Sequence, residues 1–195
     1  MINLNFEFKG ERTYVHGSDI FNALSKIARL EFNKGFVSLI AFRNIARRQC
    51  VVSFENITTK SAVATGNICA GDGAVHPFWL FECDERVVGR YAFDEDALVG
   101  AADVQMENKS ISLHCDGSAT AIECVIALTK RLTYLIAPEI DGKWLFGQLN
   151  LVTPLVAVGA VRIVQKSLLP GRMSLNEVWL DDALVGTIRF IVGKP

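Results

Sequence analysis

A histidine directly before a glycine–serine pair is the strongest chemical signal near the start of the chain. His16, Gly17 and Ser18 lie in the segment YVHGSDIFNAL, where a helical pattern begins. Such a histidine could exchange a proton with water or a substrate near pH 7. The amides of Gly17 and Ser18, at the start of a helix, could hold a carbonyl oxygen that gains negative charge. The alternative is structural: His16 caps the helix or hydrogen-bonds to a neighbouring strand.

Three further polar residues flank this helix start. Asp19 is a catalytic candidate, although a carboxylate there more often serves the amino terminus of the helix, and Ser18 or Asp19 is the predicted N-cap. Asn22 follows in an otherwise apolar helix, where a buried amide needs partners and could orient a water molecule or a substrate carbonyl. Tyr14, two residues before His16, is expected to belong to the substrate-binding surface.

A glutamate interrupts the most apolar helical segment, TAIECVIAL. Burial of the Glu123 carboxylate would be costly, so we expect it to be paired, neutralised or catalytic. The alternative places Glu123 at a helix edge, in contact with solvent or with Lys130 or Arg131.

A second glycine–serine pair follows the first after one hundred residues, in LHCDGSATAIECVIAL. At this spacing His114 aligns with Tyr14 and Asp116 with His16, so the two sites would differ chemically. We expect His114, Asp116 and Gly117 to line a second, substrate-binding site, and one of the two sites could be inactive. His114 on a predicted strand could instead be structural.

A basic cluster in FRNIARRQ could bind phosphate, because guanidinium groups pair well with phosphate oxygens. Its members are Arg43, Arg47 and Arg48. They could contact the nucleotide of coenzyme A or an acidic carrier protein; the alternative is a solvated turn. A formal net charge of −1 provides no overall field for nucleic acid, and no such partner is expected.

These residues must be positioned by two halves of similar pattern, which predict domains 1–97 and 98–195. Trp79-Leu80 and Trp179-Leu180 repeat at the same spacing as the glycine–serine pairs, and Val88-Gly89 resembles Val185-Gly186. Hydrophobic periodicity in each half indicates a strand, an apolar helix and then several strands. The expected helices run from 18 or 19 to before Asn33 and over 118–136; the expected strands are 2–8, 36–42, 50–57, 61–69, 78–93, 104–115, 144–152, 155–164, 173–181 and 184–192.

This order resembles the hotdog fold, and two copies in one chain resemble a double hotdog. The resemblance rests on the two helix entries, on the segments FRNIARRQCVVSF and LNLVTPLVAVGAVRI, and on the two Trp-Leu hairpins. It implies an α+β fold with two antiparallel sheets, each wrapping a central helix, and with the halves paired as a pseudo-dimer.

The resemblance also implies a substrate class, acyl thioesters of coenzyme A or of acyl carrier protein, bound at the junction between the halves. Hydrolysis by a thioesterase is the favoured reaction. Dehydration of a hydroxyacyl thioester is the alternative, with His16 and Glu123 as a pair across the halves, and a non-catalytic acyl-binding protein is the third. No cofactor is expected beyond the coenzyme A or phosphopantetheine of the substrate, and two such chains could form a homodimer.

Composition limits the other classes of protein. Half of the residues are hydrophobic, which is enough for a continuous core. Five cysteines without a CxxC pair and three scattered histidines indicate neither a disulfide framework nor a metal site. No apolar segment is long enough to span a bilayer, and the start of the chain alternates like a strand and not like a signal peptide. We therefore expect a cytoplasmic protein with no membrane partner.

Overall fold

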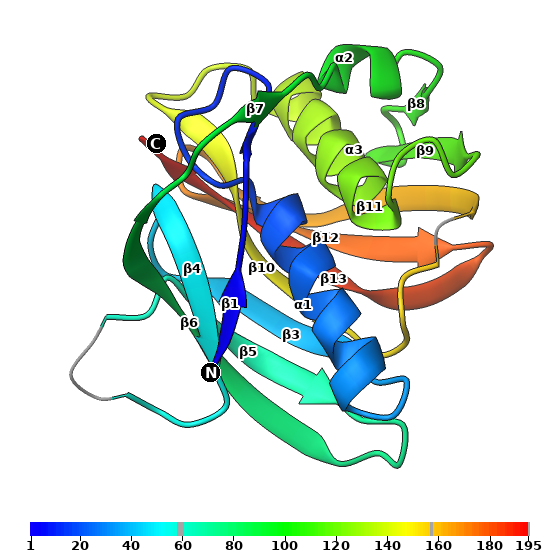
Figure 1. Ribbon diagram of the computed structural model, residues 1–195. Coiled ribbons are helices and arrows are strands. Elements are labelled where there is room, and N and C mark those ends of the chain that lie inside the picture. The colour runs from blue at the N-terminus through cyan, green and yellow to red at the C-terminus, as the bar shows by residue number, and fades with distance from the viewer. Residues whose placement is uncertain (58–60, 157, 195) are drawn as a thin grey trace. The chain divides into compact units, whose positions relative to one another are not determined.

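The computed structural model describes residues 1–57, 61–156 and 158–194. The chain divides into two compact units, Met1–Phe93 and Asp94–Pro195. Each unit has the same broad order of elements, an amino-terminal strand, one long helix and then long strands (Figure 1). The expected α+β class is confirmed. Pairing of the units as a pseudo-dimer stays a prediction.

The first unit places five strands in the order β1-β4-β6-β5-β3, each antiparallel to its neighbour. Their bounds are β1 Ile2–Leu4, β3 Phe36–Phe42, β4 Arg48–Ser53, β5 Ala64–Cys69 and β6 Val75–Arg86. Helix α1, Gly17–Glu31, packs against β3. A separate parallel pair joins β2, Phe8–Lys9, to β7, Arg90–Tyr91.

The core of the first unit lies between α1 and its sheet. The expected apolar face of α1 is buried at Ile20, Phe21, Leu24, Ile27 and Ala28. Leu30, expected on the same face, is instead 69% exposed. The helix ends where Asn33 and Lys34 adopt positive φ, as expected for a stop before Gly35.

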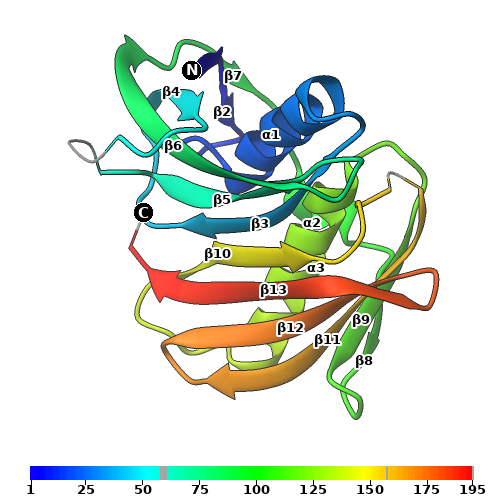
Figure 2. The ribbon, with the colours of Figure 1, turned by 90° about the horizontal axis from the view of Figure 1, so that it is seen from below.

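The second unit orders its strands β8-β9-β11-β12-β13-β10, again with antiparallel neighbours. Figure 2 shows the meander β11, β12 and β13 side by side. The bounds are β8 Asp103–Gln105, β9 Ser110–Cys115, β10 Lys143–Leu151, β11 Gly159–Leu169, β12 Met173–Leu180 and β13 Ala183–Gly193. Residue 157, inside the expected strand 155–164, lies outside the described residues.

Helix α3, Ala121–Ile136, covers this second sheet and packs against β9, β10, β11 and β12. Ten of its residues are buried, in keeping with its apolar composition. A short helix, α2, Glu95–Leu98, precedes it and was not expected from the sequence. Among the described residues, no helix is both long enough and apolar enough to span a membrane.

The two units differ in the order of their last strands. We count β1 and the four long strands after α1 in the first unit, and β9 and the four long strands after α3 in the second. The first sheet then has the order 1-3-5-4-2 and the second 1-3-4-5-2. Trp79 lies on the fifth of these strands and Trp179 on the fourth. Both strands nevertheless stand third in their sheets, and both tryptophans precede a buried leucine.

The other expected correspondences are wrong at the level of structure. Gly17 is the first residue of α1, whereas Gly117 lies before α3 in a turn with φ of +89°. Val88-Gly89 lies in the loop after β6, whereas Val185-Gly186 lies within β13. The glycine–serine and valine–glycine pairs repeat in the sequence but do not lie at equivalent positions of the two units, because loop lengths differ between the units.

Candidate functional site

Helix α1 begins at an unusual cap, His16. The residue has an extended conformation, and its Nδ1 atom accepts from the amide of Ser18 at 3.4 Å. Its carbonyl oxygen accepts from the amides of Asp19, at 3.0 Å, and Ile20, at 3.3 Å. The expectation that Ser18 or Asp19 is the cap is wrong, because the side chain of His16 reaches the first-turn amides before either can. The structural alternative for His16 is therefore realised, and it fixes the imidazole at the amino terminus of the helix.

Ser18 connects this imidazole to a buried charge pair. Its Oγ atom lies 2.7 Å from Nδ1 of His16, 3.0 Å from Nζ of Lys9 and 3.1 Å from Oδ1 of Asp19. Lys9 and Asp19 form an ion pair at 3.4 Å, with the lysine side chain fully buried and that of Asp19 15% exposed. Strand alternation from Ile2 would place Lys9 on the polar face with Asn3, Asn5 and Glu7. That prediction is wrong, because β1 ends at Leu4 and the alternation does not continue into β2.

Aromatic rings complete the surroundings of Lys9. Its Nζ atom lies 3.9 Å from the ring centroid of Phe93 and 5.7 Å from that of Tyr91. The hydroxyl of Tyr91 donates to Oδ1 of Asp19 at 2.8 Å. A desolvated ammonium is stabilised both by a carboxylate and by ring faces, and Lys9 has both kinds of contact. We call Lys9, His16, Ser18, Asp19 and Tyr91 the helix-entry cluster.

The parallel pair of β2 and β7 positions two members of this cluster. Lys9 lies opposite Tyr91 in the pair. The amides of Phe8 and Gly10 donate to the carbonyls of Gly89 and Tyr91, at 3.1 and 2.8 Å. Segments about eighty residues apart in the chain are thereby held together beside the first turn of α1.

One first-turn amide differs from its neighbours. The amides of Ser18, Asp19 and Ile20 donate to His16, but within the described part of the chain the amide of Gly17 has no acceptor. An amide at this position carries the partial positive charge of the helix terminus and can bind an anionic oxygen. Of the two amides expected to hold a substrate oxygen, Gly17 thus fits the role and Ser18 is already engaged.

Asn22 and Tyr14, the other candidates near this helix, are both half-buried. Asn22 lies four residues after Ser18 and therefore on the same face of α1. Their roles in catalysis and substrate binding stay predictions.

The candidates of the second unit do not form an equivalent site. His114 is exposed on β9, and Asp116 and Gly117 are exposed in the turn after it. The amide of Ser118 donates to Oδ1 of Asp116 at 2.9 Å. Hydrogen bonds from the hydroxyl and the amide of Ser118 lower the pKa of Asp116. These contacts stabilise a turn of the kind that Asp commonly forms, and the substrate-binding role of all three residues stays a prediction.

Glu123 is not buried in the middle of an apolar helix, because α3 begins at Ala121 and not at residue 118. Its side chain is half-buried, and Oε2 accepts from the amide and the hydroxyl of Thr120, both at 2.8 Å. Full burial of this carboxylate is therefore not found, and a catalytic role of Glu123 stays a prediction. Glu123 caps the helix through Thr120, and neither Lys130 nor Arg131 is the partner in these contacts.

The arginine cluster is surrounded by acidic residues. Arg43 and Arg47 are exposed in the loop between β3 and β4, and Arg48 opens β4. The amides of Arg47 and Arg48 donate to Oε1 of Glu82, and the guanidinium of Arg48 donates to the carbonyl of Asp84 at 3.0 Å. The carboxylate of Glu82 weakens the attraction of phosphate to this loop, and phosphate binding here stays a prediction.

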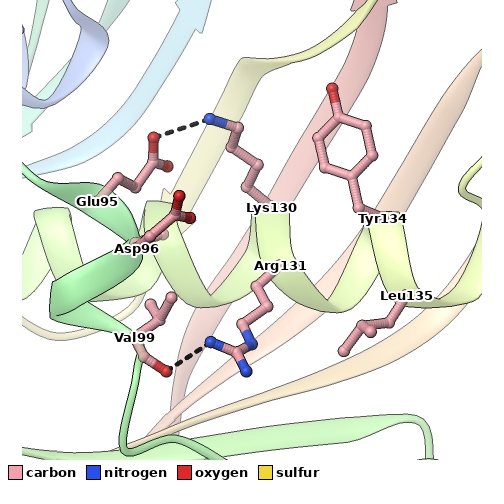
Figure 3. A pocket seen from close by; sticks show the side chains of 8 residues that line it. Glu95, Asp96, Val99, Lys130, Arg131, Tyr134 and Leu135 are labelled. Carbon is pink, nitrogen blue, oxygen red and sulfur yellow. Dashed lines mark hydrogen bonds and ion pairs between the residues drawn. The ribbon is translucent and has the colours of Figure 1, made fainter.

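A second basic pair, Lys130-Arg131, lines a pocket of about 290 Å³ in the second unit (Figure 3). The ammonium of Lys130 contacts Glu95 at 2.8 Å, and the guanidinium of Arg131 donates to the carbonyl of Val99 at 2.9 Å. Both cations therefore hold α2 and the turn after it against α3. The remaining lining residues are Asp96, Ala127, Tyr134 and Leu135.

Two functional candidates were missed by sequence reasoning, Lys9 and Tyr91. A lysine is almost never fully buried unless it is paired, and its partners here come from distant segments. No local pattern identifies either residue. The described residues contain no cluster of three His, Cys, Asp or Glu side chains that could hold a metal ion.

Comparison with known proteins gives a match only among solved structures. No family model and no curated protein matches the chain. A protein assigned as a thioesterase from Novosphingobium aromaticivorans is 12% identical, with 100% of this chain and 94% of that chain covered and a TM-score of 0.49. A protein assigned as thioesterase II from Thermobifida fusca is 13% identical, with 94% and 88% covered and a TM-score of 0.45. The erythromycin dehydratase is 13% identical, with 94% and 82% covered and a TM-score of 0.45.

Each of these three structures has a TM-score below 0.5, so the resemblance to the hotdog fold that the sequence indicates stays a prediction. In each unit a single long helix lies against an antiparallel sheet, and the order of elements is the expected one. The reaction must therefore be argued from the site.

Proposed function

We propose that the chain binds an acyl thioester at the amino terminus of α1 and hydrolyses it. The observation that carries the proposal is the position of His16 beside the amide of Gly17. That amide has no acceptor within the described residues. A thioester carbonyl placed at this amide would have its oxygen at the positive end of the helix and an imidazole within reach.

The nitrogen of His16 that would meet a substrate is Nε2, because Nδ1 is occupied by Ser18. In hydrolysis, water adds to the thioester carbon and loses a proton while the carbonyl oxygen gains negative charge. The C–S bond then breaks as the carbonyl forms again, and the departing sulfur takes up the proton, which leaves a carboxylic acid and a thiol. The amide of Gly17 stabilises the charged oxygen. Nε2 of His16 either accepts the proton of the attacking water or donates a hydrogen bond to this oxygen.

The substrate class follows from the resemblance to hotdog proteins and not from a contact in the structure. We propose a thioester of coenzyme A or of the phosphopantetheine arm of a carrier protein. Dehydration of a hydroxyacyl thioester and binding without turnover are the competing outcomes. A homodimer stays a prediction.

The test uses the purified full chain and a panel of acyl-coenzyme A substrates that includes 3-hydroxyacyl thioesters. Release of free thiol supports hydrolysis, whereas enoyl absorbance without thiol release would show dehydration instead. Thermal stabilisation by substrate with neither signal would leave a binding protein and contradict the proposal.

The variant His16→Ser tests the site itself. Serine is a good N-cap, so the helix keeps its cap while the imidazole is removed. We expect thiol release to fall by about 100-fold or more, with a melting temperature close to that of the parent protein. The matched control is His76→Ser, on β6 and outside the helix-entry cluster. Unchanged turnover in His16→Ser would contradict the assignment of this site.

A further inference from the structure

Lys9 sets the direction of hydrogen bonds in the helix-entry cluster. A lysine ammonium has three donors and no acceptor, so Ser18, at 3.0 Å, and Asp19, at 3.4 Å, both accept from it. Lys9 is fully buried and lies over the ring of Phe93. The oxygen of Ser18 thus has a fixed incoming donor.

The hydroxyl of Ser18 has a single proton, which it can donate to one of two acceptors. Nδ1 of His16 lies 2.7 Å away, and Oδ1 of Asp19 lies 3.1 Å away. Oδ1 of Asp19 already accepts from the hydroxyl of Tyr91 at 2.8 Å and from Lys9. The shorter distance favours donation from Ser18 to His16.

The backbone favours the same direction, through a contact long enough to be lost when the hydroxyl of Ser18 turns away. The amide of Ser18 can only donate, and its acceptor is Nδ1 of His16 at 3.4 Å. A proton on Nδ1 would point at this amide hydrogen. Nδ1 is therefore an acceptor, and in a neutral imidazole the proton then lies on Nε2.

We propose that Lys9 is a positioning residue that acts through Ser18 and holds His16 in the tautomer with its proton on Nε2. His16 then meets the substrate oxygen as a hydrogen-bond donor, next to the amide of Gly17, and not as the base that activates water. A neutral imidazole at a helix amino terminus is suited to polarise a carbonyl group in this way. The tautomer is a property of the free protein, while its use in the reaction rests on the function proposed above.

The test is imidazole ¹⁵N NMR of the full chain, labelled with ¹⁵N-histidine, at a pH where His16 is neutral. The signal of His16 is assigned by its loss in His16→Ser. We expect Nδ1 to resonate as an unprotonated nitrogen and Nε2 as a protonated one. A protonated Nδ1 in the parent protein would overturn the proposal.

The variant Lys9→Met tests the role of the ammonium. Ser18 loses its incoming donor and Asp19 loses one of its donors, so the hydroxyl of Ser18 should turn toward Asp19. The proton of His16 should then move to Nδ1, which reverses the two ¹⁵N signals. The double variant Lys9→Met/Asp19→Ala removes the competing acceptor and should restore the parent tautomer. The control Lys26→Met changes an exposed lysine of the same helix and should have no effect.

An unchanged tautomer in a folded Lys9→Met protein would overturn the proposal. If this variant does not fold, Ser18→Ala takes its place, because it breaks the connection while the pair of Lys9 and Asp19 remains. A population protonated at Nδ1 is expected there, and its absence would overturn the proposal equally. The NMR readout needs no substrate, so a protein without thioesterase activity contradicts the proposed function and leaves this inference separately tested.

Discussion

The amide and the hydroxyl of Thr120 both donate to one carboxylate oxygen of Glu123, each over 2.8 Å. The glutamate thereby closes the first turn of α3 and satisfies an amide that the helix itself cannot pair. A residue that the sequence suggests as catalytic has a structural role in these contacts.

Replacement of Glu123 tests this role. We expect Glu123→Ala to lower the free energy of unfolding by about 0.5–2 kcal/mol, because the cap is lost. Glu123→Gln should cost less, since glutamine serves the same position of a capping box. Urea denaturation of the two variants checks whether Glu123→Ala loses more stability than Glu123→Gln. An equal loss in both would assign the effect to the charge and not to the cap.

Gln49 is expected to be important for the stability of the first unit. Its buried side chain accepts from the amide of Phe6 at 2.7 Å and donates to the carbonyl of Phe6 at 3.0 Å. In Gln49→Leu both backbone groups of Phe6 lose their partner. We expect each loss to lower the free energy of unfolding by about 1–3 kcal/mol. The control Gln105→Leu, at an exposed position, should change stability by about 0.5 kcal/mol or less. Chemical denaturation measures both, and equal stability of the two variants would contradict the prediction.

Cys50 should contribute to loss of stability in alkali. Burial, followed by the nearby Glu82 and Cys83, raises the pKa of this thiol from 9.0 to about 12. The folded protein therefore holds the thiol proton more tightly than the unfolded chain. This contribution is complete below about pH 9 and is lost as the pH rises toward about 12.

Melting temperatures between pH 8 and pH 11 check this prediction. We expect the decline above pH 9 to be shallower in Cys50→Val than in the parent protein, because the variant has no thiol to ionise there. Identical slopes in the two proteins would contradict it.

Asp116 should titrate below its ordinary pKa of 3.8, because the hydroxyl and then the amide of Ser118 bind its carboxylate. Ionised Asp116 stabilises the folded protein relative to the unfolded chain above pH 3.8. This contribution is lost as the pH falls through the lowered pKa of Asp116 in the folded protein. Ser118→Ala removes only the hydroxyl, so the pKa should rise part of the way back. Carbon NMR of the carboxyl group during an acid titration measures it, and a fall in the pKa of the variant would refute the assignment.

Element types were predictable where local patterns are strong. The strand Phe36–Phe42 was predicted with its exact bounds, because β-branched and aromatic residues fill it and turns flank it. The buried face of α1 was predicted from its spacing, except at Leu30. The helix starts were not, because His16 is an uncommon cap and Glu123 completes the first turn of α3 through Thr120.

The candidate site was predictable only in part. Three members of the helix-entry cluster, His16, Ser18 and Asp19, are neighbours in sequence, and the pattern of a polar helix start identified them. Lys9 and Tyr91 were missed, because alternation placed Lys9 on the solvent side and Tyr91 lies far along the chain.

The amino-acid sequence by itself determined the α+β class, the two long helices and most strands, because these depend on the spacing of apolar side chains along a few turns or residues. Only the tertiary structure decided the strand order, which differs between the units, and the pairing of β2 with β7 that buries Lys9 against Ser18 and Asp19. Such contacts join residues far apart in the chain, and their free energy depends on which groups remain to be paired once water is excluded.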